Sequence, residues 1–383
     1  MCSNKKRIIV VISIIILSLL STNPAFAESD DLCKEAERIA LSFMTNSTGE
    51  RCDPRTVTRF YDFNGNVTAF CVSISRAGKP SGYVLISLLA EKDPIVEFSF
   101  DGIGLVESIN KVYGNRYLIR DEKQYVYLGP DLLFVIDENK RSCLDVYTGK
   151  ENILSDVEKV SDICLGMNNR DDIGGGIMSF WSGSVLASSI NMISSFGNPT
   201  NYWNISSLDP DGGNTCAPTC ATNIVWYWAT KRSCSWAQPF SSGTDQDKAR
   251  SVFAVLKLAM CTSDTLGTMD NMISVGYSDY LEYVCGGDNY SITNVVNNDY
   301  SSFVDAIDDN CPIHTSLWPY NSILCDGHDV MTYGYAESTS GTEYLMVMDG
   351  WNTDYRILQF SYYTSGTRLI KGRKIWIGTS MYG

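Results

Sequence analysis

The sequence predicts an α+β fold in two successive domains, and three observations lead to that prediction. Twice along the chain, a segment of helical periodicity is followed by a run of strand-like segments. This order is typical of α+β domains, in which helices and antiparallel strands form separate blocks. Residues 28–383, about 356 in all, exceed what one hydrophobic core usually covers. A glycine-rich segment of low periodicity separates the two blocks and has the composition of a linker.

Residues 1–27 have the three regions of a secretory signal peptide. A basic leader, "MCSNKKR", precedes an apolar run of fourteen residues, and small residues follow at Ala25 and Ala27. The apolar run is short for a membrane span, which needs about 20 residues. We therefore expect cleavage before Glu28 and a secreted protein, extracellular or at the cell surface, with no membrane attachment after cleavage.

The chain that remains is acidic and rich in cysteine. Removal of the leader takes Lys5, Lys6 and Arg7 from the 30 basic residues, so 27 would face 44 acidic ones, a net charge of −17. This balance argues against nucleic acid or an anionic membrane as a partner, because both need clustered Lys and Arg. Twelve of the 13 cysteines remain, and an even count in an exported protein suggests disulfides. If one thiol is catalytic, at least one other must be free.

The first block, residues 28–165, contains one predicted helix and several predicted strands. Apolar residues recur at helical spacing from Asp30 to Thr45. The dipeptide Asn64-Gly65 is a strong hairpin signal and is followed by alternating apolar residues. Further strands are predicted at "GYVLISLLAE" and "PIVEFSF", and a second hairpin at "LLFVIDENKRSCLDVYTG". This half has no histidine and no polar cluster typical of a site, so we interpret it as an accessory domain.

Residues 166–184 form the predicted linker, and residues 185–383 the second domain. The linker has three consecutive glycines at 174–176 and is a candidate for proteolytic processing. Helices are predicted at "APTCATNIVWYWA", "TDQDKARSVFAVLKLAM" and "SSFVDAIDD". Strands are predicted at "CPIHTSLW", "HDVMTYGYAE", "TEYLMVMDGW" and "YRILQFSYY".

Cys216 and Cys220 lie at the start of the first of these helices, and Cys216 is the candidate nucleophile. A cysteine nucleophile must be a thiolate, which a helix N-terminus and a nearby histidine both favour. Asn214 and Thr215 are typical capping residues, so Cys216 is expected in the first turn, where Pro218 is also tolerated. Cys220 would lie one turn further on, where the dipole effect has faded. We interpret it as a buried or disulfide-bonded thiol.

The chain has two histidines, and His328 is the predicted general base. It follows Gly327 at the start of a predicted strand, where other groups can approach closely. His314 lies within another predicted strand and is interpreted as a packed or surface residue. Asp349 closes an apolar strand, where a charge is unusual without a partner, and is predicted to orient the imidazole. A plain strand-end turn is the alternative role for Asp349, and Trp351 beside it would shield the hydrogen bond from water.

Three motifs together resemble the catalytic blocks of papain-like cysteine peptidases, most closely those of the bacterial C39-like group. They are "NTCAPT" opening an apolar helix, "GHDVMTYGY" and "YLMVMDGW". In that group the nucleophile block reads Cys-Gly-Pro-Thr and the base block Gly-His-Ala-Val. Ala217 therefore replaces a glycine here, and Asp329 replaces an alanine. The resemblance covers most of residues 181–383.

The resemblance implies a papain-like fold and acyl transfer to peptide bonds. Cys216 would be the nucleophile, His328 the general base and then acid, and Asp349 the orienting residue. The implied partner is a peptide or protein substrate, and the implied mechanism uses no cofactor. With only two histidines in the chain, a zinc site of the Cys/His type is improbable, so no metal ligand is assigned.

The oxyanion donor is the point at which this chain departs from the family pattern. Papain-like peptidases usually have a Gln about six residues before the nucleophile, and Pro210 stands at that place here. The backbone N–H of Cys216 would supply one donor. The side chains of Asn214 and Asn204 are the two candidates for the second.

The first half resembles, less specifically, the pro-domain of streptopain-type peptidases, through its "GYVLIS…PIVEFS" pattern. That resemblance implies a domain that inhibits the enzyme by covering its active site until it is cut away. The chain is therefore interpreted as a secreted zymogen with a signal peptide (1–27), a pro-domain (28–165), a linker (166–184) and a peptidase domain (185–383).

Two other functions remain open from the sequence. One is a cell-wall amidase or endopeptidase that cuts peptidoglycan, although no wall-binding repeat is present in the sequence. The other is a secreted binding protein that retains the fold without activity, which the absence of the upstream Gln makes conceivable. Substrate preference does not follow from the sequence.

Overall fold

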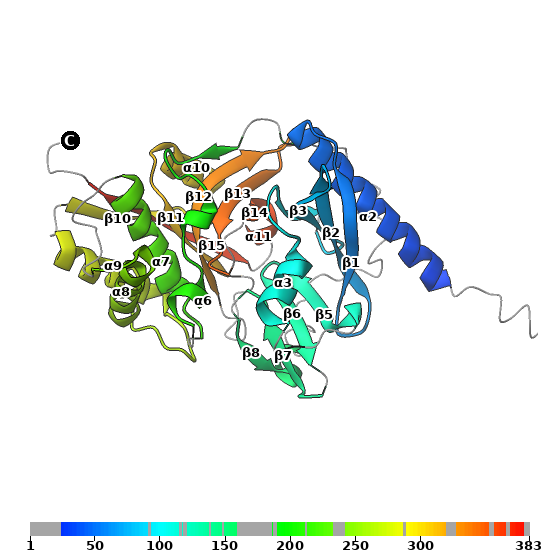
Figure 1. Ribbon diagram of the computed structural model, residues 1–383, viewed down its shortest axis with the longest axis horizontal. Helices are drawn as coiled ribbons and strands as arrows, with labels where there is room; N and C mark the ends of the chain where they lie inside the picture. The colour runs from blue at the N-terminus through cyan, green and yellow to red at the C-terminus, as the bar shows by residue number, and fades with distance from the viewer. Residues whose placement is uncertain are drawn as a thin grey trace, which may run out of the picture.

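A computed structural model of the chain shows an α+β fold in two lobes, which confirms the predicted fold class (Figure 1). The structure describes residues 24–378 except 91–92, 115–116, 118–120, 138, 148, 159–185, 187–189, 211–212, 233–241, 286–288, 319–326, 352–355 and 365–367. We call the described residues up to 158 the N lobe and those from 186 onward the C lobe. The predicted linker, residues 166–184, lies wholly outside the described residues.

The N lobe combines helices with a sheet. Its helices are α2 (Pro24–Thr48) and α3 (Leu105–Tyr113), with the short 3-10 helix η1 (Glu122–Gln124). Its strands are β1 (Asp53–Tyr61), β2 (Val67–Arg76), β3 (Lys79–Ser87), β4 (Ile95–Ser99), β5 (Tyr125–Gly129), β6 (Leu132–Asp137), β7 (Ser142–Asp145) and β8 (Glu151–Ile153). Neighbouring strands are antiparallel apart from the pair β1 and β5.

One apolar face fixes α2 on the sheet. Its buried residues recur at spacings of three and four: Ala36, Ile39, Ala40, Phe43 and Met44. They pack on β1, β2 and β3, and burial of a side chain as large as Phe43 contributes roughly 2–3 kcal/mol. The predicted helix is confirmed, and it extends beyond the expected bounds at both ends.

Both hairpins predicted in this half are present. In the turn between β1 and β2, the backbone N–H groups of Asn64 and Asn66 each donate to Asp62 Oδ1 at 2.8 Å. Gly65 has a φ of 83°, a conformation that glycine adopts without strain. The second hairpin joins β6 to β7 with Asp137 opposite Ser142.

The C lobe places its helices on one antiparallel sheet. Its helices are α6 (Ile205–Leu208), α7 (Cys216–Trp226), α8 (Asp245–Ala259), α9 (Asp270–Cys285), α10 (Tyr300–Asp308) and α11 (Phe360–Thr364), with the 3-10 helix η2 (Pro199–Asn201) and the π-helical turn η3 (Tyr227–Lys231). Its strands are β9 (Asn191–Met192), β10 (Tyr290–Val295), β11 (Ile313–Trp318), β12 (His328–Glu337), β13 (Glu343–Met348), β14 (Arg356–Gln359) and β15 (Leu369–Ile377). Helix α7 packs against β11 and β12, and α8 packs on α7.

The two lobes share one continuous sheet. Its strand order is β10-β15-β11-β12-β13-β14-β4-β3-β2-β1-β5-β6-β7-β8, with β9 beside β12. The junction is the antiparallel pair β14 and β4, in which Ile357 lies opposite Phe98 and Leu358 opposite Glu97. Strands far apart in the sequence therefore lie side by side at the centre of the molecule (Figure 1).

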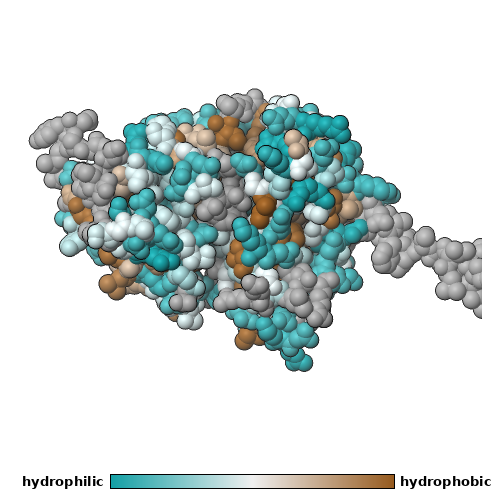
Figure 2. Space-filling view, in the orientation of Figure 1, coloured by the Kyte–Doolittle hydropathy of each residue, from teal (hydrophilic) through white to brown (hydrophobic). Residues whose placement is uncertain are grey.

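The hydrophobic core also runs through both lobes. Phe98 of β4 packs edge-on against Tyr344 of β13, with ring centroids 5.2 Å apart. Polar contacts cross the same boundary, since Ser87 Oγ lies 2.9 Å from the hydroxyl of Tyr362 and Thr342 donates to Asp93 at 3.0 Å. On the face drawn in Figure 2, most of the surface is hydrophilic and hydrophobic residues form separate patches.

Several features differ from the sequence predictions. The segment "YRILQFSYY" was expected to be one strand, but β14 ends at Gln359 and the chain then turns into α11. Strands β5, β10 and β15 and helix α3 were not predicted. Among the described cysteines, these thiols are free: Cys52, Cys71, Cys143, Cys216, Cys220, Cys261 and Cys311. Within the described part of the chain, no helix is both long and apolar enough to cross a membrane.

Candidate active site

Helix α7 begins at Cys216, so the candidate nucleophile lies in the first helical turn as expected. Backbone N–H groups of this turn have no helical acceptor, and they favour a negative charge at the sulfur. The expected side-chain cap is absent, because Thr215 makes no capping hydrogen bond and Asn214 donates to the carbonyl of Thr265 at 2.7 Å. Pro218 follows in the same turn without losing a helical hydrogen bond.

The thiol of Cys216 is hydrogen-bonded to a carboxylate. Its Sγ donates to Asp329 Oδ2 at 3.8 Å. Although the residue keeps partial exposure, burial of the sulfur raises the pKa of Cys216, and the negative charge of Asp329 raises it further. In this arrangement the sulfur is therefore a neutral thiol. Cys220, one turn further into α7, is buried and free, as one of the two interpretations expected.

Asp329 belongs to a buried polar network that the sequence analysis did not assign. Its Oδ1 accepts from Ser316 Oγ at 2.6 Å and lies 3.2 Å from Nε2 of His314, whose Nδ1 lies 3.1 Å from the hydroxyl of Tyr277. Burial alone would raise the pKa of Asp329, but the hydrogen bonds from His314 and Ser316 outweigh it and the pKa is lowered. Burial lowers the pKa of His314 despite the neighbouring carboxylate. The pair is thus an ionised Asp329 beside a neutral imidazole.

His328 begins strand β12 and is almost completely enclosed, at 1% exposure. Among the described residues, neither of its ring nitrogens has a hydrogen-bond partner. Burial lowers its pKa to about 4, against the opposing effect of Asp349. Its ring centroid is 6.4 Å from that of Tyr147, which the N lobe provides. The structure therefore leaves His328 neutral and not hydrogen-bonded to the thiol.

Strand alternation explains why His328 and Asp329 have different neighbours. Successive side chains of a strand point to opposite faces. In β12, Asp329 lies opposite Ser316 on the face that α7 covers, whereas His328 lies opposite Leu317 and is close to Tyr147. An aspartate at the position of the family's alanine was visible in the sequence and is the signal that could have revealed this network.

Asp349 follows the last residue of β13, next to the start of β12. The pairing of Met331 with Met348 brings these strand ends together, and the charge of Asp349 acts on His328. Asp349 Oδ1 accepts from the backbone N–H of Trp351 at 2.8 Å. The next residue, Gly350, has a φ of 72° and accepts from the backbone N–H of Ile205 at 2.7 Å. The turn after β13 is thereby fixed beside α6.

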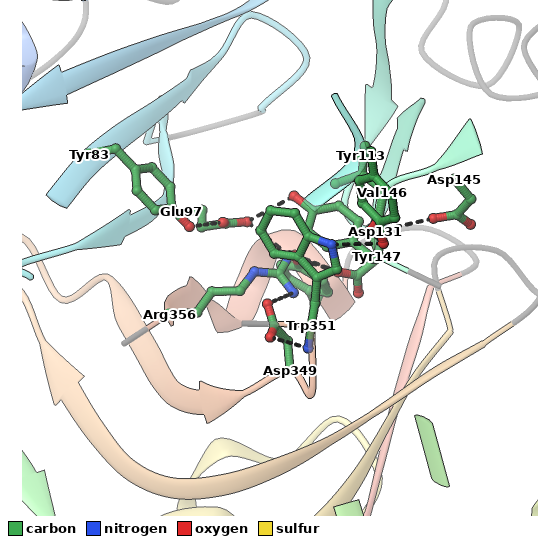
Figure 3. Close-up of polar contacts among 11 residues, drawn as sticks. Tyr83, Glu97, Tyr113, Asp131, Asp145, Val146, Tyr147, Asp349, Trp351 and Arg356 are labelled. Carbon is green, nitrogen blue, oxygen red and sulfur yellow. Dashed lines mark hydrogen bonds and ion pairs between the residues drawn. The ribbon is translucent and has the colours of Figure 1, made fainter. Parts of the chain in front are cut away.

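Trp351 links this turn to the N lobe. Its indole Nε1 donates to the hydroxyl of Tyr113 at 2.9 Å, and the two rings are stacked with centroids 6.2 Å apart (Figure 3). Trp351 is 5% exposed, but the hydrogen bond that it was expected to shield, between His328 and Asp349, does not form among the described residues. Tyr113 is the last residue of α3, a helix that the sequence did not predict.

Arg356 is the centre of a second buried polar cluster, which we call the Arg356 cluster (Figure 3). Its Nη2 donates to Glu97 Oε2 at 2.9 Å and to Asp131 Oδ1 at 2.8 Å, and its Nη1 lies 4.0 Å from Asp349 Oδ2. The guanidinium carbon is 4.1 Å from the ring centre of Tyr147. All these charged side chains are about 2% exposed. The cluster joins two N-lobe carboxylates to the turn that carries Asp349.

The two candidate oxyanion side chains are engaged elsewhere. Asn214 uses its amide group on Thr265, as described above. Asn204 caps α6, because its Oδ1 accepts from the backbone N–H of Ser207 at 2.9 Å. Asn214 therefore uses its donor group on Thr265, whereas Asn204 uses its acceptor oxygen on α6, and the role of either side chain as an oxyanion donor stays a prediction.

A protein-family model matches most of the C lobe. Residues 198–368 match the model of the Peptidase_C39 like family, a region that contains Cys216, His328 and Asp349. This match confirms the resemblance found in the sequence. No curated protein matches the chain in sequence. Six solved chains match in structure, one of them a fragment of prointerpain A from Prevotella intermedia that is 11% identical, with a TM-score of 0.39 over 84% of this chain and 98% of that one.

Proposed function

We propose that the chain is the secreted zymogen of a papain-like cysteine endopeptidase in which Cys216, His328 and Asp349 hydrolyse peptide bonds. The observation that carries the proposal is the meeting of three chain segments: the first turn of α7, the start of β12 and the turn after β13. These segments hold the three residues in the order nucleophile, base and orienting carboxylate. The match to the Peptidase_C39 like family supports the same reading.

The closed arrangement fits an inactive precursor. The thiol of Cys216 is paired with Asp329, and His328 is covered by Tyr147 of the N lobe. A thiolate needs a base at hydrogen-bonding distance, and His328 does not occupy that place here. Because His328 points to the opposite face of β12 from Asp329, we infer that departure of the N lobe lets the first residues of this strand rearrange and bring the His328 ring to the thiol.

The chemistry then follows from the residues at hand. The Cys216 sulfur, after giving its proton to His328, would attack the peptide carbonyl, and the oxyanion would accept from the backbone N–H of Cys216. His328 would protonate the leaving amine, which leaves a thioester on the enzyme. A water molecule activated by His328 would release the acyl group, with Asp349 holding the imidazole in orientation.

A pair of cysteine variants tests the proposal in the full chain. We expect Cys216→Ala to abolish casein hydrolysis and linker cleavage, and Cys220→Ala to retain both because that thiol is buried packing. Iodoacetamide should label Cys216 fastest once the N lobe has been cut off, as shown by peptide mapping. Labelling elsewhere with Cys216 inert would falsify the assignment.

Two further measurements separate the remaining alternatives. Zymography with casein and with peptidoglycan distinguishes a peptidase from a cell-wall enzyme. N-terminal sequencing of the secreted protein locates the cleavage of the leader and of the linker. If Cys216→Ala keeps the biological effect of the protein, the chain is a binding protein instead.

A further inference from the structure

The charge balance of the Arg356 cluster depends on the N lobe. Two carboxylates lie within hydrogen-bonding distance of the guanidinium, and both Glu97 and Asp131 come from that lobe. The C lobe contributes Asp349, at 4.0 Å, and the hydroxyl of Tyr363, at 3.2 Å. Within the described part of the chain, Nε and Nη1 of Arg356 have no hydrogen-bond partner. Without the N lobe, a buried cation would therefore lose its two nearest anions.

Strand β4 supplies one of these anions together with a backbone pairing. Glu97 is the middle residue of β4, and this strand pairs with β14, which begins at Arg356. Its other neighbour is β3, so loss of the N lobe would leave β14 as an open sheet edge. An exposed edge pairs readily with another extended segment.

The residue after Glu97 makes an apolar contact on the other face of the sheet. Phe98 packs edge-on against Tyr344 of β13, and Tyr344 is completely buried. Departure of β4 would uncover this ring on the face of the sheet opposite the guanidinium, because Tyr344 lies three positions along β13 from Val347, the partner of Arg356. The segment that fits here is therefore extended and has an acidic residue followed by an aromatic one.

We propose that the edge of β14, with Arg356 and Tyr344, is a docking subsite for substrate segments that carry an acidic-aromatic pair. Strand β4 occupies this subsite until the N lobe leaves. The proposal rests on the peptidase function proposed above and names a substrate feature for it. Asp131 adds a second carboxylate, so the N lobe satisfies Arg356 more fully than a substrate with one acid does.

The test uses a full chain with Cys216→Ala, cut in the linker and kept with both pieces in solution. Glu97→Gln is added so that the N lobe competes less strongly for the subsite. The probes are two fluorescent heptapeptides: Pro-Ile-Val-Glu-Phe-Ser-Phe, which is the sequence of residues 94–100, and the same peptide with Gln in place of Glu. Binding is measured by fluorescence anisotropy.

We expect the Glu peptide to bind about 10- to 100-fold more tightly than the Gln peptide, the range given by one hydrogen bond to a charged group. Adding Arg356→Gln should make the two peptides equal, and Arg356→Lys should retain part of the preference. Equal binding with Arg356 present, a Glu preference that survives Arg356→Gln, or no binding of either peptide would each overturn the proposal. A melting curve on each variant shows whether it is folded.

Failure of the subsite and failure of the peptidase function give different results. Binding is measured with Cys216→Ala, so it does not depend on catalysis. If the Glu peptide is preferred but the chain that retains Cys216 hydrolyses no peptide, the result supports the subsite and rules out the peptidase assignment. If the chain that retains Cys216 hydrolyses peptides but the Glu peptide is not preferred in the binding test, the result supports the peptidase function and rules out the subsite.

Discussion

The sulfur of Cys216 lies beside the carboxylate of Asp329. This neighbour changes the pKa of the thiol in the opposite direction to a protonated histidine. A protonated imidazole lowers the pKa of a thiol, whereas a carboxylate raises it. Asp329 is itself held by His314 and Ser316, which lower its pKa and keep it charged. As long as this carboxylate is the partner of Cys216, the neutral thiol is favoured.

Neutralising Asp329 should make the thiol more reactive. We expect Asp329→Asn to raise the rate of iodoacetamide labelling of Cys216 in the full chain about tenfold at neutral pH, since one pKa unit changes the thiolate fraction tenfold. The measurement is the pH profile of labelling, read by mass spectrometry. Ser316→Ala is the matched control, because it removes a hydrogen bond but keeps the charge. Identical profiles for Asp329→Asn and the unmodified chain would contradict this role.

The buried His328 should make the closed form less stable in acid. Its pKa is about 4 in the folded chain and 6.5 when unperturbed. Between these values the unfolded chain binds a proton that the folded chain does not, so stability falls as the pH falls through this window. We expect His328→Gln to reduce the loss between pH 7 and pH 4 by up to about 3 kcal/mol, measured by urea unfolding. The raised pKa of Asp131 has the opposite effect on the pH dependence of stability. Because Asp131 is present in both proteins, its contribution cancels in the comparison. Parallel stability curves would rule the contribution out.

At the scale of elements, helix α3 ends in the contact between the lobes. The hydroxyl of Tyr113 accepts from Trp351 and donates to the carbonyl of Val146 at 3.2 Å. This residue therefore connects the N lobe to the turn that holds Asp349. A helix of nine residues acts here as the support for one interlobe hydrogen bond.

Removing that hydroxyl should loosen the contact. We expect Tyr113→Phe to lower the free energy of unfolding by about 1–3 kcal/mol, because the buried indole N–H of Trp351 would lose its acceptor. Urea denaturation of the full chain measures the change. Tyr125→Phe is the control, since that hydroxyl bonds Asn110 within the N lobe, in a partly exposed contact of 3.3 Å. An equal cost for both variants would argue against a special role for Tyr113.

The elements that the sequence predicted are those whose local pattern was strong. Helix α2 and the hairpin at Asn64-Gly65 follow from spacing and turn chemistry alone. Strand β15 was missed because basic residues and Gly372 interrupt its alternation, and its place between β10 and β11 is fixed by long-range pairing. The tail of "YRILQFSYY" was assigned wrongly, because Phe360, Tyr362 and Tyr363 have strand propensity but are buried in a helical turn.

For the whole molecule, the continuous sheet predicts joint unfolding of the two lobes. Opening the junction would expose the edge of β14 and leave Arg356 without Glu97 and Asp131, and breaking a buried ion pair costs several kcal/mol. We expect the full chain to melt in a single calorimetric transition. Glu97→Gln combined with Asp131→Asn should split it into two. Two transitions in the unmodified chain would refute the coupling.

In the candidate site too, residues in local sequence motifs could be predicted, whereas those brought together by long-range contacts could not. Cys216, His328 and Asp349 each stand in a recognisable local motif, so their candidacy could be read from the sequence. The Arg356 cluster could not, because Glu97 and Asp131 lie 259 and 225 residues away in the chain. Nothing near "PIVEFS" indicates that its glutamate meets an arginine of the other lobe.

The strand order also sets when the molecule can close during its synthesis. Strand β15 lies between β10 and β11, and Arg356 supplies the cation for two carboxylates made much earlier. Strand β15, Leu369–Ile377, is synthesised after both of the strands that flank it in the sheet. Until then the C-lobe sheet lacks an inner strand, and for most of synthesis Glu97 and Asp131 have no counter-ion. We therefore expect the C-lobe sheet to close only after Leu369–Ile377 has left the ribosome.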